Sequence, residues 1–512
     1  MRKLLLIAPV IFLIGICNGQ EAAKGTPEWR PDYHFTPLKN WTNDPNGLIY
    51  LNGEYHLYYQ HNPFENKWGH MSWGHATSKD LLNWKHLPVA IPEKIDKDTT
   101  TWIFSGSAVW DKNNTSGFCK NGGCLVAIYT ANQPNQKKES QFIAYSNDHG
   151  LTFTNYNKNP VIDLNKKDFR DPNVFWHAQS KKWIMTVALP TEFKVNFYSS
   201  ENLKDWILES DFGPQGFAKN PWECPFIIQL PIDGNAKKSK WVLFVSSGGP
   251  KGGPFMQYYV GDFDGKTFKN DNPSDEPLVV DYGDAFYAAI PWNDAPKQKK
   301  IFIGWLVPQE QQTYPWRGQM SIPRDLSLRT TASGIRLFQK PSSVISKSVL
   351  KSRSNPPISV DIKEIADEEI LLNDKSRINQ NANWIEAEFE LGTAKNIGFK
   401  LGQKKDQNGK VIQETVVSYD IIKKQLFIDR SLSGSDKKNE SKLVQTIDLL
   451  PVNGKIKLQI LIDKSSLEVF ANDGEKVIST LIFPDKGSTY MSVFAANGDV
   501  KIKSLKIYDL SK

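Results

Sequence analysis

The chain of 512 residues is poor in cysteine and histidine and lacks the patterns of several common protein classes. It has four Cys and eight His. No second Cys or His pair completes a four-ligand set beside Cys119 and Cys124, so the spacing does not indicate zinc. The net charge is +7, but no basic run is interleaved with aromatic residues, and we interpret the charge as a solvated surface and not as a nucleic-acid groove. No long stretch keeps helical periodicity, which argues against a helical fold.

A long transmembrane run is also missing. Arg2 and Lys3 precede an apolar run from Leu4 to Ile16, which is too short for a stable membrane anchor and typical of a secretory signal. We therefore predict a signal peptide or lipoprotein leader over residues 1–19 and an exported protein. In one alternative Cys17 is lipidated and attaches the protein to a membrane at the cell surface or in the periplasm. In the other, cleavage after Gly19 releases a secreted protein.

Three cysteines follow the predicted leader: Cys119, Cys124 and Cys224. Cys119 and Cys124 flank a short turn between two strand-like runs. A hairpin tip of this composition can bring both sulfurs within bonding range in an oxidising compartment, so we predict a disulfide there. Cys224 has no evident partner and is expected to be a buried free thiol.

An internal repeat predicts the fold. Four segments each run from a strand end through a polar turn to an aromatic residue: 75–84, 145–153, 198–206 and 261–268. The closing aromatics are 69, 53 and 62 residues apart. A four-stranded blade with its turns needs roughly 40 to 50 residues, and more with functional loops, so this period suits a β-propeller. With a weaker repeat near Leu326 to Phe338, we predict five blades over residues 28–340.

The composition changes after Pro341. A Ser- and Lys-rich stretch leads through Asn355-Pro356-Pro357 into a region poorer in Trp. Strands such as Trp384 to Leu391, separated by polar turns, predict a C-terminal β-sandwich over residues 358–512. The whole chain is thus expected to be all-β. Stabilisation of the propeller is the expected role of the sandwich, and accessory contact with a glycan is the alternative.

Three carboxylates stand in unusual surroundings. Asp44 lies in Trp41-Thr42-Asn43-Asp44-Pro45-Asn46-Gly47, Asp171 in Arg170-Asp171-Pro172, and Glu223 in Trp222-Glu223-Cys224-Pro225. Hydrolysis of a glycosidic bond requires one carboxylate at the sugar carbon and a carboxylic acid at the departing oxygen. A following Pro fixes the chain and favours an extended backbone for the acid. Each motif also has a structural interpretation, as a turn, an ion pair or a surface residue.

Together these motifs resemble those of glycoside hydrolase family 32, the invertases, inulinases and levanases. The resemblance covers nearly all of the chain after the leader. Further matching stretches are Tyr58-Tyr59-Gln60-His61-Asn62-Pro63, Trp73-Gly74-His75-Ala76, Phe104-Ser105-Gly106-Ser107-Ala108, Phe286-Tyr287-Ala288-Ala289, Ile303-Gly304-Trp305, Ser321-Ile322-Pro323-Arg324 and Asp463-Lys464-Ser465-Ser466-Leu467-Glu468-Val469-Phe470.

The resemblance implies a role for each acid and a retaining mechanism. Asp44 would be the nucleophile, Glu223 the acid/base, and Asp171 the stabiliser of the oxocarbenium-like transition state. No metal and no cofactor is implied. The residues implied to contact the bound fructosyl unit are Asn43, Gln60, Trp68, Ser107, Arg170 and Trp305, the last as an aromatic wall. The 16 Trp of the chain suit sugar stacking, although most are expected to pack between strands.

Two departures from the family pattern bear on the substrate. Where close relatives read Asp-Phe-Tyr-Ala, this chain has Ala285-Phe286-Tyr287-Ala288, with Asp284 one residue earlier. The loop from Leu306 to Pro315 is shorter than in exo-acting relatives. Both features favour an open cleft, so we predict cleavage of fructans, with β-2,6-linked levan as substrate and internal cutting preferred. The alternatives are an exo-acting fructan β-fructosidase, inulinase or invertase and, in a different class, a glycan-binding propeller without catalysis.

Overall fold

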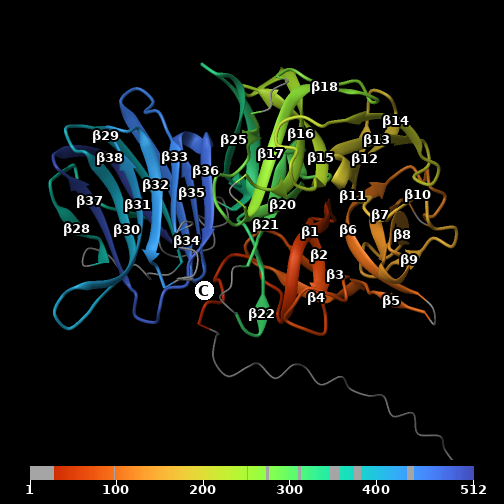
Figure 1. Cartoon of the computed structure of the whole chain (residues 1–512), viewed down its shortest axis with the longest axis horizontal. Helices are drawn as coiled ribbons and strands as arrows, with labels where there is room; N and C mark the ends of the chain where they lie inside the picture. Colours follow the sequence, from red (N-terminus) through yellow and green to blue (C-terminus); the bar gives the residue numbers. More distant parts are fainter. Residues whose placement is uncertain are drawn as a thin grey trace, which may run out of the picture.

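The computed structural model describes residues 28–511 except 97–98, 121, 251, 273–275, 309–312, 346–356, 374–381 and 435–442. The predicted leader, with Cys17, lies outside the described residues. Nearly all regular structure is β-strand, and a five-bladed arrangement lies beside a two-sheet sandwich (Figure 1). The predicted all-β fold, a propeller followed by a sandwich, is confirmed. In the described part of the chain, no helix has the length and apolarity needed to cross a bilayer.

The first three blades are separate antiparallel sheets. Blade I contains β1 (Asn40–Leu51), β2 (Glu54–Asn62), β3 (Ser72–Ser78) and β4 (Lys85–Ile91). Blade II contains β5 (Lys94–Ile95), β6 (Thr100–Asp111), β7 (Cys124–Gln133), β8 (Lys138–Ser146), β9 (Thr154–Asn155) and β10 (Ile162–Lys166), with η1 (Pro134–Gln136) between β7 and β8. Blade III contains β11 (Arg170–His177), β12 (Lys182–Leu189), β13 (Lys194–Ser200) and β14 (Ile207–Phe212), with η2 (Pro190–Glu192).

The last two blades share a sheet through one parallel pairing between β15 and β24. Blade IV contains β15 (Glu223–Ile232), β16 (Asn235–Gly248), β17 (Pro254–Phe263), β18 (Phe268–Asn270) and β19 (Leu278–Val279). Blade V contains β20 (Phe286–Pro291), β21 (Ile301–Leu306), β23 (Gln319–Met320), β24 (Arg324–Thr331) and β25 (Gly334–Pro341), with η3 (Pro296–Gln298). β22 (Trp316–Arg317) pairs with β1 and so closes the ring between the last blade and the first.

The sequence repeat corresponds to one position in the blades. In blades I to IV the repeated segment is the turn that leaves the third strand and ends at an aromatic residue before or at the next strand: Trp84, Phe153, Trp206 and Phe268. The weaker fifth repeat is the hairpin of β24 and β25. The repeat is visible in the sequence because each of these blades has the same kind of turn and closing aromatic residue at its outer edge.

The sandwich has a sheet of seven strands and a sheet of six, both antiparallel. The first contains β26 (Ile358–Ser359), β27 (Glu364–Ala366), β29 (Asn383–Leu391), β34 (Lys455–Asp463), β35 (Ser466–Ala471), β36 (Lys476–Leu481) and β38 (Asp499–Asp509). The second contains β28 (Glu369–Leu371), β30 (Asn396–Lys405), β31 (Val411–Asp420), β32 (Gln425–Leu432), β33 (Val444–Asp448) and β37 (Tyr490–Ala496), and η6 (Asn472–Gly474) joins β35 to β36. Alternating apolar residues of both sheets form its core.

The sandwich and the propeller are joined by buried ion pairs. His34, just before β1, lies 2.8 Å from a carboxylate oxygen of Asp463 and 2.9 Å from one of Glu468. Arg324 of blade V pairs with Asp281 at 2.9 Å and with Glu468 at 2.6 Å. These side chains are almost completely buried, and apolar residues of both domains surround them in one continuous core. The contact between the two domains is therefore buried and packed like the core of a single domain.

Candidate active site

A cleft of about 610 Å³ opens at the centre of the propeller. Side chains from all five blades line it, which places residues more than 200 positions apart in one cavity. The lining residues are Asn43, Asp44, Gln60, Trp68, Trp102, Phe104, Ser105, Asn132, Pro134, Lys137, Glu139, Lys167, Asp168, Arg170, Asp171, Glu223, Tyr287 and Trp305. The three predicted catalytic acids thus lie in one cavity.

The innermost strand of every blade is interrupted at the level of the cleft. Each of these strands shifts its register against its neighbour: between Thr42 and Pro45 in β1, Ile103 and Gly106 in β6, Arg170 and Asn173 in β11, Glu223 and Phe226 in β15, and Tyr287 and Ile290 in β20. A bulge leaves residues unpaired and re-aims their side chains. Pro45, Pro172 and Pro225 suit these positions because proline has no N–H to give to a ladder.

The sequence predicted an extended backbone at the acids, and the backbone dihedral angles contradict this in part. Asp171 has φ of 66° and Cys224 has φ of 48°, so neither is extended. The prediction that a following proline holds the acid in an extended conformation was wrong for Asp171, because the bulge requires a left-handed residue there. Such a conformation in a residue other than glycine costs about 1–3 kcal/mol, and persists where the surrounding structure enforces it.

Asp44 is held by hydrogen-bond donors on both oxygens. Ser105 of β6 donates its hydroxyl to one carboxylate oxygen at 2.6 Å, and the Asn43 amide donates to the other at 3.2 Å. Trp41 in turn donates its indole N–H to the Asn43 oxygen at 2.8 Å, which fixes the orientation of that amide. The Asp44 carboxylate is therefore aimed by its neighbours while part of the residue stays open to the cleft.

Cys224 connects Asp44 and Asp171. Its sulfur lies 3.6 Å from a carboxylate oxygen of each acid, and its backbone N–H donates to the Asp171 carboxylate at 2.9 Å. Cys224 is buried and forms no disulfide, as the sequence predicted. Burial raises the pKa of this thiol well above its usual range, and the adjacent carboxylates raise it further. The thiol therefore keeps its proton and can donate it to either acid.

Glu223 is held by an arginine and a tyrosine. Arg170 donates to one Glu223 oxygen from Nε at 3.1 Å and from Nη2 at 2.9 Å, and Tyr287 donates its hydroxyl to the other oxygen at 2.6 Å. The remaining guanidinium nitrogen of Arg170 donates to Glu139 at 3.2 Å and to Asp168 at 3.1 Å. A single cation thus bridges Glu223 to two further carboxylates.

The carboxyl groups of the cleft outnumber its cations. Burial raises the pKa of Asp171 to about 8 against the attraction of Arg170, and nearby Glu223 and Asp44 act in the same direction as burial. Burial also raises the pKa of Asp44, although the hydrogen bond from Ser105 opposes the change. Like charges in a poorly solvated cavity disfavour simultaneous ionisation. The substrate-free cleft is thus a site where a proton is readily held among several acids, as acid–base chemistry requires.

Ser107, which was predicted to contact the fructosyl unit, does not line the cleft, and Asp284, noted beside the missing acid, is not a lining residue either. Ser107 is buried, accepts from the Val174 backbone N–H at 2.8 Å, donates to the Pro172 carbonyl at 3.1 Å, and does not line the cleft. It braces β6 against β11, and Ser105 contacts Asp44 instead. Asp284 does not replace the acid missing at Ala285. Its carboxylate accepts from Thr480 at 2.6 Å and pairs with Arg430, both in the sandwich.

Of the two departures noted in the sequence, the one at Ala285 does not lie in the wall of the cleft. Ala285 is fully buried and is not a lining residue. Of the loop from Leu306 to Pro315, residues 309–312 lie outside the described residues. The other predicted contacts, Asn43, Gln60, Trp68, Arg170 and Trp305, all line the cleft.

The sequence reasoning missed four polar residues of the cleft that contact Asp44, Glu223 or Arg170 directly, namely Ser105, Tyr287, Glu139 and Asp168. Ser105 and Tyr287 stand in stretches that matched the family, so a signal existed for them, although neither was assigned a role. Glu139 and Asp168, which hold Arg170, carry no signal in the sequence. Glu139 is followed by ordinary strand residues of β8, and only the fold brings it to Arg170.

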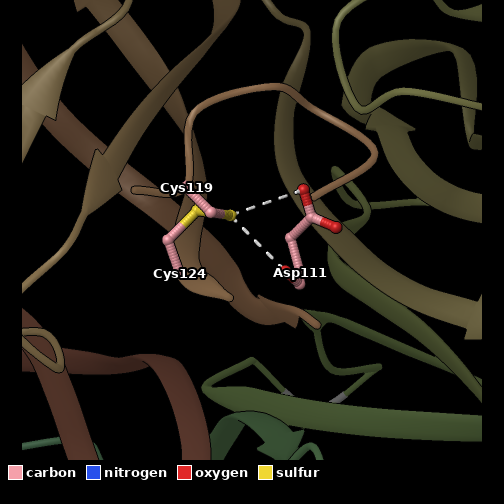
Figure 2. Close-up of side chains that lie close together, drawn as sticks. All are labelled: Asp111, Cys119 and Cys124. Carbon is pink, nitrogen blue, oxygen red and sulfur yellow. Dashed lines mark hydrogen bonds between the residues drawn. A yellow bond between two sulfur atoms is a disulfide. The ribbon is translucent and has the colours of Figure 1, made fainter. Parts of the chain in front are cut away.

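Cys119 and Cys124 form a disulfide, with Asp111 beside it (Figure 2). The Cys119 sulfur lies 3.4 Å from the Asp111 carbonyl oxygen and 3.9 Å from its carboxylate. Although these three residues meet in space, the Asp111 carboxylate already accepts four hydrogen bonds from the backbone and hydroxyls of Thr115 and Ser116. The group thus fastens the hairpin between β6 and β7, away from the cleft.

The fold and the cleft define a class: a propeller in which carboxylates from different blades converge on one cavity, as in glycosidases. The model of the glycosyl hydrolases family 32 N-terminal domain matches residues 34–341, and the model of the family's C-terminal domain matches residues 349–509. The chain therefore belongs to glycosyl hydrolase family 32 and is a glycosidase.

Similar proteins agree with this assignment over the full length. The chain is 44% identical to a levanase from Bacillus subtilis, with 100% of this chain and 76% of that protein aligned. It is 37% identical to an extracellular exo-inulinase from Aspergillus ficuum, over 100% of this chain and 99% of the other. The crystal structure of an exo-inulinase from Aspergillus awamori superposes with a TM-score of 0.86 at 36% identity, covering 95% of this chain and 99% of that one.

Proposed function

We propose that this glycosidase cleaves β-D-fructofuranosidic linkages in fructans with retention of configuration, and that levan is its preferred substrate. The observation that supports this most strongly is the convergence of Asp44, Asp171 and Glu223, from β1, β11 and β15, on one cleft. The similarity to a levanase supports the choice of levan. A binding protein without catalysis has no need of three carboxylates held at a cost in stability.

Asp44 and Glu223 divide the bond-breaking chemistry. The Asp44 carboxylate attacks the anomeric carbon of the fructosyl unit and forms an ester, while Glu223 transfers its proton to the departing oxygen. The ionised Glu223 then takes a proton from water, which attacks the same carbon and frees Asp44. Ser105 and Asn43 keep the Asp44 oxygens aimed. Arg170 and Tyr287 hold Glu223 at the leaving oxygen.

Asp171 acts on the charge that develops in the sugar ring. Its carboxylate lies against the same thiol as Asp44, so both face the fructosyl unit. A negative charge placed next to a developing oxocarbenium ion stabilises the transition state more than the ground state. Its orientation is set by the Cys224 N–H and by the bulge in β11.

Two modes of cutting have support. Internal cutting is supported by the size of the cleft, which extends beyond the three acids. Cutting from the chain end is supported by the exo-inulinases among the similar proteins. Time-resolved product analysis on levan, inulin and sucrose separates the two. A ladder of oligosaccharides in the first minutes indicates internal cutting, free fructose alone indicates exo-action, and failure to hydrolyse any of the three would refute the proposed function.

We also propose that the protein acts outside the cytoplasm. The relative from Aspergillus ficuum is an extracellular enzyme, and a disulfide between Cys119 and Cys124 suits an oxidising compartment. In this proposal Cys17 is lipidated and holds the enzyme at a membrane. Fractionation of cells that express the chain with Cys17 intact or as Cys17→Ala tests it. Release of the variant from the membrane fraction is expected, and equal distribution of both forms would contradict lipidation.

A further inference from the structure

The cleft is larger than one sugar unit requires. Its volume of about 610 Å³ lies within the range of roughly 300–1,000 Å³ that buries drug-sized ligands, which are much larger than a hexose. The three acids account for one part of the lining. Another part is formed by Asn132 near the end of β7, by Pro134 and Lys137 in the connection to β8, and by Lys167 and Asp168 just before β11.

A hydrogen-bond network connects this region of the cleft to Glu223. Glu223, which protonates the departing oxygen in the proposed mechanism, is bonded to Arg170. The far nitrogen of Arg170 is bonded to Asp168 and Glu139. Lys167 adjoins Asp168 in sequence, and Lys137 lies two residues before Glu139. The network therefore connects the acid to the two chain segments that carry the lysines.

The two lysines differ from their immediate neighbours in sequence. Lys138 pairs with Asp163 at 2.9 Å, and Lys166 pairs with Glu192. Lys137 and Lys167 are exposed, line the cleft, and form no ion pair with any residue that the structure describes. Lys137 is set in place by its left-handed backbone at the end of η1, with φ of 51° and its N–H donated to the Pro134 carbonyl at 3.2 Å.

We propose that Lys137 and Lys167 form a binding subsite for the sugar units on the leaving side of the cleaved bond, and so favour long fructans over sucrose. This subsite rests on the proposed fructan hydrolysis. Each ammonium group offers three donors to sugar hydroxyls. A fructan places further sugars in this region, whether it is cut internally or from its end, whereas the single glucose of sucrose ends close to Glu223.

The test compares kcat/KM on levan and on sucrose for Lys137→Ala, Lys167→Ala and the double variant. Loss of a modest hydrogen bond corresponds to about fivefold, so each single variant should lower the levan-to-sucrose ratio about fivefold and the double variant roughly 20-fold. The change should lie mainly in KM for levan, because contacts with remote sugars are kept in both ground and transition states. Lys138→Ala and Lys166→Ala are matched controls and should leave both activities unchanged.

Three outcomes would overturn the subsite. Equal losses on levan and sucrose would mean that the lysines act on the catalytic acids through charge. An unchanged ratio in the double variant would mean that they are solvated surface residues. An equal change in the Lys138 and Lys166 controls would assign the effect to surface charge in general. A wild-type enzyme that hydrolyses sucrose but neither levan nor inulin would refute the proposed function itself, a result distinguishable from all three.

Discussion

Two groups of buried carboxylates in this protein have opposite properties. Those in the cleft share Arg170 between Glu223, Glu139 and Asp168, and neither Asp171 nor Asp44 forms an ion pair with any described residue. The group at the contact of propeller and sandwich has matched partners. There His34 lies between Asp463 and Glu468, and Arg324 lies between Glu468 and Asp281.

The pKa shifts of the acids differ between the cleft and the contact with the sandwich. In the cleft, burial raises the pKa of Asp171 and Asp44. At the contact with the sandwich, burial acts in the same direction on Asp463 and Glu468, but His34 and Arg324 outweigh it and lower both pKa values. A buried acid therefore stabilises the fold where its partners outweigh burial, as at Asp463 and Glu468. Asp281 is the exception at this contact, because burial raises its pKa although Arg324 pairs with it.

The largest expected effect is on chemistry in the cleft. Asp44→Asn and Glu223→Ala should each lower kcat on fructans about ten-thousandfold, since each removes a group that makes or breaks a bond. Burial raises the pKa of Asp44, so its charge does not stabilise the fold, and the thermal midpoint of Asp44→Asn should stay at or above that of the wild type. Turnover near the wild-type level in either variant would show that its assignment is wrong.

A matching change at the sandwich contact should affect stability. Arg324→Met leaves Asp281 buried without its cation and Glu468 with His34 alone, and removal of one partner of a buried pair costs about 3–5 kcal/mol. We expect this loss in the free energy of unfolding, measured by urea denaturation, with kcat per folded molecule retained. Lys194→Met, which breaks the exposed pair with Asp211, is the control and should change stability little. Equal stability of the two variants would remove the distinction between the two carboxylate groups.

The Asp171→Asn variant should lose activity and gain stability. Turnover should fall roughly thousandfold at about pH 8 and above, where the Asp171 carboxylate is ionised and its charge stabilises the developing cation. The folded protein holds the Asp171 proton up to about pH 8, whereas the unfolded chain releases it near pH 3.8. The residue therefore destabilises the fold increasingly as the pH rises between these values. The variant should gain thermal stability over the wild type, more at pH 8 than at pH 5; unfolding with intact activity per folded molecule would instead favour a structural ion pair with Arg170.

The smallest effect concerns alkaline pH. Burial alone would lower the pKa of His34, but hydrogen bonds to Asp463 and Glu468 raise it from 6.5 to about 9. Its contribution to stability is thus complete below pH 6.5 and is lost as the pH rises through 9. The stability advantage of the wild type over His34→Gln should shrink by about 3 kcal/mol across this window. His75→Gln is the control: burial lowers the pKa of His75 to about 3, so its difference from the wild type should not vary there.

Much of the fold was predictable because it depends on local, repeated features. The strand-to-aromatic turns that gave the period are the edge turns of blades I to IV, and each can be read from about ten consecutive residues. The acids themselves were also visible, since proline beside Asp44, Asp171 and Cys224 marks positions where a strand ladder cannot continue. These proline bulges gave the site a signal in the sequence that ordinary surface acids lack.

The sequence by itself determined the all-β class, the propeller with its sandwich and the glycosidase family, and it singled out three acids that the fold brings into one cleft. Only the tertiary structure decided which side chains surround those acids. Ser105 and not Ser107 contacts Asp44, Asp284 turns to the sandwich, and Glu139 reaches Arg170 from another blade. The physical reason is that a bulge reverses which residues face the cavity, and that charge balance in a buried site depends on neighbours from distant strands, whose distances no local pattern contains.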